Sequence, residues 1–214
     1  MKNVCKYSLA AGILIFLLSQ SIHFEDLEAI RQQRRREAFN AAQYAEDFWL
    51  NQLPDVLDEA VDAKELIELF KTDMPRAIER HGKAPGVSRV YAYLLRGEGT
   101  ILSVGTDGVK VSVGEPRTNP DILIETGLYI PGNAVRDASG LIDVSDFSDT
   151  MKFNEIGGEI NKIIVRDVIR PFLDKEPAAD RTVRFFGATQ VAQDAFEDGT
   201  PEFLRVVPIR LELE

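Results

Sequence analysis

The chain has 214 residues, of which 44% are hydrophobic and 28% are charged, and its formal net charge is −10. These proportions are typical of a folded globular protein and exclude a disordered chain. Nucleic-acid-binding proteins neutralise phosphates with lysine and arginine, so the negative charge argues against a nucleic-acid partner. One cysteine cannot form an internal disulfide, and two histidines are too few for most histidine-based zinc sites. We therefore predict no metal and no other cofactor.

Residues 1–24 predict a signal anchor or a signal peptide. Residues 7–24 contain no lysine, arginine, aspartate or glutamate, and Lys2 and Lys6 precede them. A stretch of this length is just sufficient to cross a bilayer as a helix. The prediction is that residues 7–24 insert in the inner membrane and that the rest of the chain is periplasmic.

This N-terminal segment allows three interpretations. A retained anchor competes with a signal peptide cleaved near Ser21, since the apolar run also has the length of a signal-peptide core. A lipoprotein signal needs a cysteine directly after the apolar run, and Cys5 precedes the run, so this interpretation is rejected. The basic segment 31–36 opposes a cytoplasmic N-terminus by the positive-inside rule. The order of a basic and then an apolar segment favours export, and a retained anchor is preferred.

Residues 25–84 form the predicted helical region. Residues 25–51 are predicted to be one long helix, which Pro54 ends or kinks. Its basic segment 31–36 is either a solvated helix face or a contact with anionic lipid headgroups. The apolar stripe of this helix is predicted to consist of Phe39, Ala42, Ala45, Trp49 and Leu53.

Two shorter helices are predicted to follow. Asp62 and Glu65 have the spacing of a capping box, which predicts a helix that begins after Asp62. Asp73 followed by Pro75 predicts the start of another helix, which ends at His81 and Gly82. His81 is interpreted as a helix-end residue rather than as a ligand.

Residues 85–214 predict an OB-fold-like five-stranded barrel with one internal helix, so the fold class is α+β. Three strands, a helix and two strands follow one another, which is the order of that small Greek-key barrel. Pro208 predicts that the last strand lies at a sheet edge, and Gly97 and Gly99 predict a bulge or a barrel corner. The predicted strands and helix are, in order, 91–104, 109–113, 121–130, helix 153–169, 182–188 and 204–213. Thr106-Asp107-Gly108 predicts a hairpin turn between the first two strands.

The richest polar cluster lies between the third strand and the helix. Arg136 beside Asp137 has the planar fork that binds a sugar hydroxyl or a carboxylate. Asp143 and Asp146 are candidates for a pair of hydrolytic carboxylates, although aspartate is also common as a cap in turns. The predicted ligand-binding residues are Asn133, Arg136, Asp137, Asp143 and Asp146. No catalytic set is predicted.

Several segments resemble a bacterial family of predicted periplasmic lipoproteins known as domain of unknown function 2291. The resembling segments are FNAAQYAEDFWLNQLP (39–54), RGEGT (96–100), NAVRDASGLIDVSDF (133–147), VRFFGA (183–188) and VVPIRLELE (206–214). Many members carry a lipobox cysteine, which this chain lacks. The resemblance implies a periplasmic location and an accessory role beside sugar ABC transporters, but it implies no activity.

Three functions follow from these observations. The first is a non-enzymatic, membrane-anchored binding or accessory module whose partner is a small carbohydrate or a sugar ABC-transporter component. The second is a carbohydrate-active hydrolase that uses Asp143 and Asp146. The third is a structural scaffold in which the helix 25–51 sets a distance from the membrane.

Overall fold

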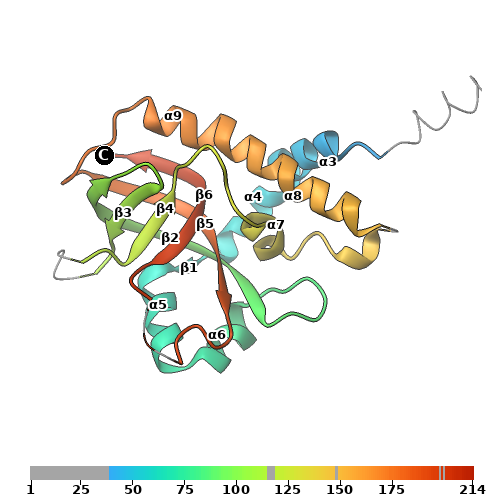
Figure 1. Ribbon diagram of the computed structural model, residues 1–214, viewed down its shortest axis with the longest axis horizontal. Coiled ribbons are helices and arrows are strands. Elements are labelled where there is room, and N and C mark those ends of the chain that lie inside the picture. The colour runs from blue at the N-terminus through green and yellow to red at the C-terminus, as the bar shows by residue number, and fades with distance from the viewer. Residues whose placement is uncertain (1–38, 115–118, 148, 198, 200) are drawn as a thin grey trace, which may run out of the picture. The chain divides into compact units, whose positions relative to one another are not determined.

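The computed structural model describes residues 39–114, 119–147, 149–197, 199 and 201–214 (Figure 1). The predicted anchor at residues 7–24 and the first part of the predicted helix 25–51 lie outside these residues. Within them, no helix has both the length and the apolar character needed to cross a membrane. Residues Asn40–Glu214 form one compact unit.

The first helical segment contains a widened turn before Pro54. It consists of α3 (Ala41–Asp47), the π-helical turn η1 (Phe48–Gln52), α4 (Leu53–Val56) and the 3-10 turn η2 (Leu57–Glu59). Proline has no N–H, and its ring collides with the carbonyl four residues earlier. A π-turn relieves the collision, and the N–H of Leu53 accordingly donates to the Phe48 carbonyl.

This turn changes which side chains are buried. Phe48 and Leu53 are buried, Trp49 is half-buried and Ala42 is exposed. The predicted stripe was therefore wrong at Ala42 and omitted Phe48. The reason is that a regular period of 3.6 residues does not continue through a π-turn.

The long internal helix also contains a π-turn before a proline. It comprises α8 (Thr150–Ile164), the π-turn η4 (Val165–Ile169) and α9 (Arg170–Leu173). Pro171 follows the π-turn as Pro54 does, and the N–H of Arg170 donates to the Val165 carbonyl. The predicted helix 153–169 is confirmed and extends further at both ends. At its C-terminal end the π-turn lets the chain pass Pro171 without breaking.

The two short helices are α5 (Ala63–Thr72) and α6 (Met74–His81), as predicted. The Asp62 carboxylate accepts from the N–H groups of Lys64 and Glu65, at 2.9 and 3.2 Å. The Asp73 carboxylate accepts from the N–H of Arg76 at 3.1 Å. Each aspartate thus satisfies N–H groups that the first turn of its helix leaves without intrahelical partners.

Loss of the Asp73 cap should measurably lower the free energy of unfolding. We expect Asp73→Ala to lower the free energy of unfolding by about 1 kcal/mol, the usual effect of deleting a helix N-cap. Asp73→Ser keeps an acceptor at the same place and should retain most of the stability. Urea unfolding of the full-length protein in detergent measures both. Equal losses in the two variants would contradict a capping role.

In the described part of the chain, five strands close into a ring, and the two-residue strand β1 is attached outside it. In the sheet order β1-β2-β3-β4-β6-β5, β5 also pairs with β2 and thereby closes the ring. The pairing of β4 with β6 is parallel, while all other pairings within the ring are antiparallel. The strands are β1 (Val61–Asp62), β2 (Val90–Val104), β3 (Gly108–Ser112), β4 (Ile122–Glu125), β5 (Thr182–Ala192) and β6 (Leu204–Leu213).

This closed order confirms the predicted barrel and corrects two details. β4 ends at Glu125, so the predicted strand 121–130 was too long. The strand β6 as a whole is not at an edge, because it lies between β4 and β5, but its pairing with β4 ends at Val206 and does not reach Pro208. Pro208 is tolerated at the register shift where it lies opposite Gly187. Such an irregularity is where a strand can hold a residue that donates no ladder hydrogen bond.

The barrel core also includes side chains from the helices that precede it. Leu66 and Phe70 of α5 pack in one cluster with Tyr93 of β2 and Phe185 of β5. The rings of Phe70 and Tyr93 meet edge to face, with centroids 4.9 Å apart. Figure 1 shows α5 and α6 at the end of the barrel opposite α8 and α9. Helices α5 and α6 and the barrel therefore share one core.

Candidate functional site

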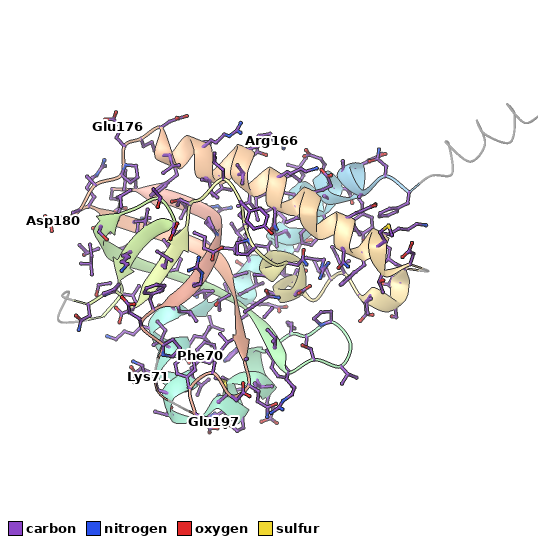
Figure 2. The ribbon with its side chains drawn as sticks, viewed as in Figure 1. Phe70, Lys71, Arg166, Glu176, Asp180 and Glu197 are labelled. Atoms are coloured by element: carbon purple, nitrogen blue, oxygen red, sulfur yellow. The ribbon has the colours of Figure 1, made fainter. Side chains whose placement is uncertain are left out.

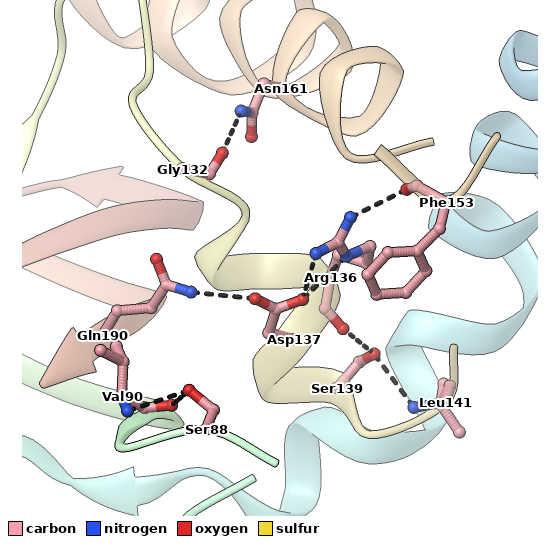
Figure 3. Close-up of polar contacts among 10 residues, drawn as sticks. All are labelled: Ser88, Val90, Gly132, Arg136, Asp137, Ser139, Leu141, Phe153, Asn161 and Gln190. Carbon is pink, nitrogen blue, oxygen red and sulfur yellow. Dashed lines mark hydrogen bonds and ion pairs between the residues drawn. The ribbon is translucent and has the colours of Figure 1, made fainter. Parts of the chain in front are cut away.

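The Arg136–Asp137 pair lies in α7 (Ala134–Ser139), between the barrel and α8 (Figure 3). Nε and Nη2 of Arg136 both contact Oδ1 of Asp137, at 2.8 and 2.7 Å. Nη1 donates to the Phe153 carbonyl of α8, and the guanidinium lies 3.5 Å from the centroid of the Phe153 ring. Oδ2 of Asp137 accepts from Gln190 of β5 at 2.9 Å. The pair thus connects α7, α8 and the barrel.

Burial governs the electrostatics of this pair. Arg136 is 3% exposed and Asp137 is 8% exposed. Burial raises the pKa of Asp137 and lowers that of Arg136, and the attraction between the two groups opposes both shifts. Each charge is therefore tolerated because of the other. Both oxygens of Asp137 and the three guanidinium nitrogens already have protein partners, which makes the pair a structural connection.

The other three predicted ligand residues, Asn133, Asp143 and Asp146, are not members of this ion pair. Asn133 is half-buried and packs against Gly157 of α8. Asp143 is exposed and caps the 3-10 turn η3 (Val144–Asp146) by accepting from the N–H of Ser145 at 2.7 Å. Hydrogen bonding by the side chain of Ser145, and then by its backbone N–H, lowers the pKa of Asp143. Asp146 is exposed in the same turn. A ligand role for the five residues stays a prediction.

A different group of side chains converges on the outer face of the barrel. Cross-strand register places Asp62 opposite Arg96, Arg96 opposite Phe186, and Phe186 opposite Arg210. A second row, two residues along each strand, has Glu98 opposite Arg184 and Arg184 opposite Glu212. Residues two apart on a strand share a face. The two rows line a cavity of about 300 Å³, here named the sheet pocket, formed by Asp62, Arg96, Gly97, Glu98, Arg184, Phe185, Phe186, Arg210 and Glu212.

Gly97 lines the sheet pocket between the outward-facing Arg96 and Glu98, and a side chain at this position would point into the core. A Cβ atom at this position would lie 2.9 Å from Cζ of Phe185 and 3.2 Å from Cβ of Ala63. The predicted alternative of a bulge is not observed at Gly97 or Gly99 in the pairing with β5, which is uninterrupted from Val90 to Thr100, and the alternative of a barrel corner stays a prediction. The glycine is needed for a close approach to the Phe185 ring, which a side chain would prevent.

The charges of the sheet pocket are unevenly paired. Arg184 Nε contacts Glu98 Oε2 at 2.6 Å and Arg184 Nη2 contacts Glu214 Oε1 at 2.9 Å. These carboxylates raise the pKa of Arg184. The guanidinium of Arg210 lies 5.5 Å from the centroid of the Phe186 ring. Among the described residues, neither Arg96 nor Arg210 forms an ion pair.

Two other cavities have polar groups that the fold already uses. One, of about 320 Å³, lies where α5 and α6 meet the loop after β5 and includes Phe70, Lys71 and Glu197 (Figure 2). Its lysine pairs with Glu68. The other, of about 550 Å³, lies along α8 and η4. Its Arg166, which Figure 2 labels, forms ion pairs with Glu46 and Asp167.

Sequence reasoning missed the sheet pocket. The alternation of each strand marks Arg96, Glu98, Arg184 and Arg210 as outward-facing, but three separate strands must be aligned before they meet. Only the observed register does this. Within the described part of the chain, no three histidine, cysteine, aspartate or glutamate side chains are grouped closely enough to hold a metal ion.

Comparison with known proteins supports the fold and assigns the family. The crystal structure of an OB-fold protein from Thermotoga maritima is similar, with 27% sequence identity and a TM-score of 0.72, over 83% of this chain and 99% of that one. No curated protein matches the chain significantly. The family model described as predicted periplasmic lipoprotein (DUF2291) matches residues 12–212. The chain therefore belongs to the DUF2291 family of predicted periplasmic lipoproteins.

Proposed function

We propose that the chain is a non-enzymatic, membrane-anchored periplasmic module that binds a small carbohydrate in the sheet pocket. The observation that carries the proposal is the half-buried Phe186, which lies between Arg96 and Arg210 on the barrel surface. A sugar ring has an apolar C–H face that packs on an aromatic ring. Its hydroxyl groups pair with planar side chains such as arginine and glutamate.

The size and composition of the sheet pocket support this ligand class. Its volume of about 300 Å³ is at the small end of the range for small-molecule sites. Aromatic surface combined with a few converging polar groups is the usual composition of such sites. Three segments that carry the family resemblance, 96–100, 183–188 and 206–214, supply most of the lining.

A nucleic-acid ligand, which other OB-folds bind, is less well supported. The chain carries a net charge of −10, and the sheet pocket itself contains Asp62, Glu98 and Glu212. Hydrolysis by Asp143 and Asp146 gains no support either, because Asp143 caps a turn. The connection with a sugar ABC transporter is the proposed cellular context, and co-purification of permease or binding-protein components with the full-length protein tests it.

Replacement of Phe186 tests the ligand site. We expect Phe186→Ala to weaken sugar binding at least about tenfold, since stacking on the ring contributes on the order of 1 kcal/mol or more. Isothermal titration of the full-length protein in detergent with a panel of monosaccharides measures the Kd. Tyr129→Ala is the matched control, because Tyr129 is 82% exposed and lies outside the sheet pocket.

Two outcomes of this experiment contradict the proposal. Absence of binding to every sugar in the panel rejects a carbohydrate ligand. Sugar binding that Phe186→Ala leaves unchanged rejects the sheet pocket as its site.

A further inference from the structure

We infer that the ligand of the sheet pocket is an acidic sugar, whose carboxylate binds between Arg96 and Arg210 while its hydroxyl groups face Glu98 and Glu212. This inference rests on the proposed function and adds the chemical class of the carbohydrate. It follows from how charge is distributed between the two rows of the pocket.

The first row has surplus positive charge. It contains Arg96 and Arg210 on either side of Phe186, and neither arginine forms an ion pair among the described residues. The carboxylate of Asp62, at the end of this row, is engaged with the first turn of α5, where Oδ1 accepts from two backbone N–H groups. Two guanidinium groups therefore line the pocket with N–H donors that no ion pair among the described residues uses.

The second row has surplus negative charge. Its only cation, Arg184, is shared by Glu98 and Glu214, and Glu212 lies opposite it in the register. Carboxylates of this kind accept hydrogen bonds from hydroxyl groups. They repel a second carboxylate, so the anionic end of a ligand is directed to the other row.

The two rows together define one orientation for a ligand. Phe186, in the positive row, supplies a ring on which an apolar sugar face packs. Arginine binds a carboxylate through two parallel N–H donors, which neutral sugars cannot exploit fully. A ring with a carboxylate at one end and hydroxyl groups at the other satisfies both rows, and this is the structure of a hexuronic acid.

A comparison of four probes tests the inference. We expect D-galacturonate or D-glucuronate to bind the full-length protein at least about tenfold more tightly than the matching neutral hexose, the difference made by one well-formed ionic hydrogen-bonded contact. Acetate should not compete at equal concentration, because it has a carboxylate but no ring. Glucosamine should bind more weakly than the neutral hexose, because its ammonium group meets two free arginines.

Variants of the two arginines supply the second readout. Arg96→Gln and Arg210→Gln should each weaken binding of the uronate more than binding of the neutral hexose, and so remove most of the preference for the uronate. Arg170→Gln is the matched control, since Arg170 is exposed on α9 and does not line the sheet pocket. Melting temperatures of the unliganded variants verify folding.

The outcomes separate this inference from the proposed function. Phe186-dependent binding of neutral hexose with no preference for the uronate overturns the inference and leaves the proposed function standing. Preference for glucosamine also overturns it. Competition by acetate as strong as that by uronate shows a simple anion site and overturns both, as does an absence of binding to all sugars.

Discussion

Arg136→Ala should lower the free energy of unfolding by about 3–5 kcal/mol, the cost of removing one partner from a buried ion pair. The variant leaves the Asp137 carboxylate, 8% exposed, with Gln190 as its remaining side-chain donor. It also removes the bond to the Phe153 carbonyl, through which α7 is attached to α8. Urea unfolding of the full-length protein in detergent at pH 7 measures the loss.

The pH dependence of this loss identifies its cause. Burial raises the pKa of Asp137, and in the variant the guanidinium no longer opposes that shift. A carboxyl with a raised folded-state pKa binds more protons in the folded than in the unfolded state. Its penalty is therefore absent below the unfolded pKa of about 3.9 and grows as the pH rises toward the folded-state pKa. The difference between wild type and Arg136→Ala should accordingly shrink between pH 7 and pH 4.5.

Two further variants serve as controls. Arg166→Ala also removes an arginine from ion pairs, but its side chain is 54% exposed, so we expect a loss within about 1 kcal/mol. The double variant Arg136→Met with Asp137→Leu removes both charges and should recover most of the stability lost by Arg136→Ala. A loss below about 1 kcal/mol in Arg136→Ala would contradict the structural role of the pair.

Gly108→Ala should be the second strongly destabilising change, with an expected loss of about 2–3 kcal/mol from overpacking. A Cβ atom at this position would overlap the Ile124 carbonyl oxygen, which belongs to the backbone of the paired strand β4. A flexible side chain could rotate away from such a contact, whereas a backbone carbonyl moves only with its strand. Thermal and urea unfolding of the full-length protein measure the effect.

Gly105→Ala is the matched control in the same hairpin. Gly105 donates its N–H to the Gly108 carbonyl at 2.9 Å, and a Cβ at Gly105 would approach no closer than 3.6 Å. We expect a change within about 0.5 kcal/mol, or a small gain from reduced flexibility of the unfolded chain. Similar losses in both variants would show that the turn conformation, and not the contact with β4, requires glycine.

Gly108 also shows which part of the local structure the sequence predicts and which part it does not. Thr106-Asp107-Gly108 predicts a hairpin turn at the correct place, between β2 and β3. The prediction attributes the glycine to turn conformation, yet Gly108 is not among the described glycines with positive φ. The glycine is required by an adjacent strand, and that strand is known only once β3 and β4 are paired.

The candidate site shows the same division. Arg136 and Asp137 were identified from their residue types as a ligand site, and the fold buries them between two helices and the barrel. Residue types do not reveal burial in a segment of six helical residues without a repeated apolar pattern. The sheet pocket was not predicted, because each of its charged residues is an ordinary outward-facing residue of its own strand and gives no sign of a site.

The sequence by itself determined the local elements: the aspartate caps of α5 and α6, the alternating strands, and the order of strands and helix that identifies the barrel. These features depend on residues within a few positions of one another. The tertiary structure decided the register that brings Arg96, Phe186 and Arg210 together. It also decided the burial of Pro208 and of Arg136, because each of these depends on contacts between segments far apart in the chain.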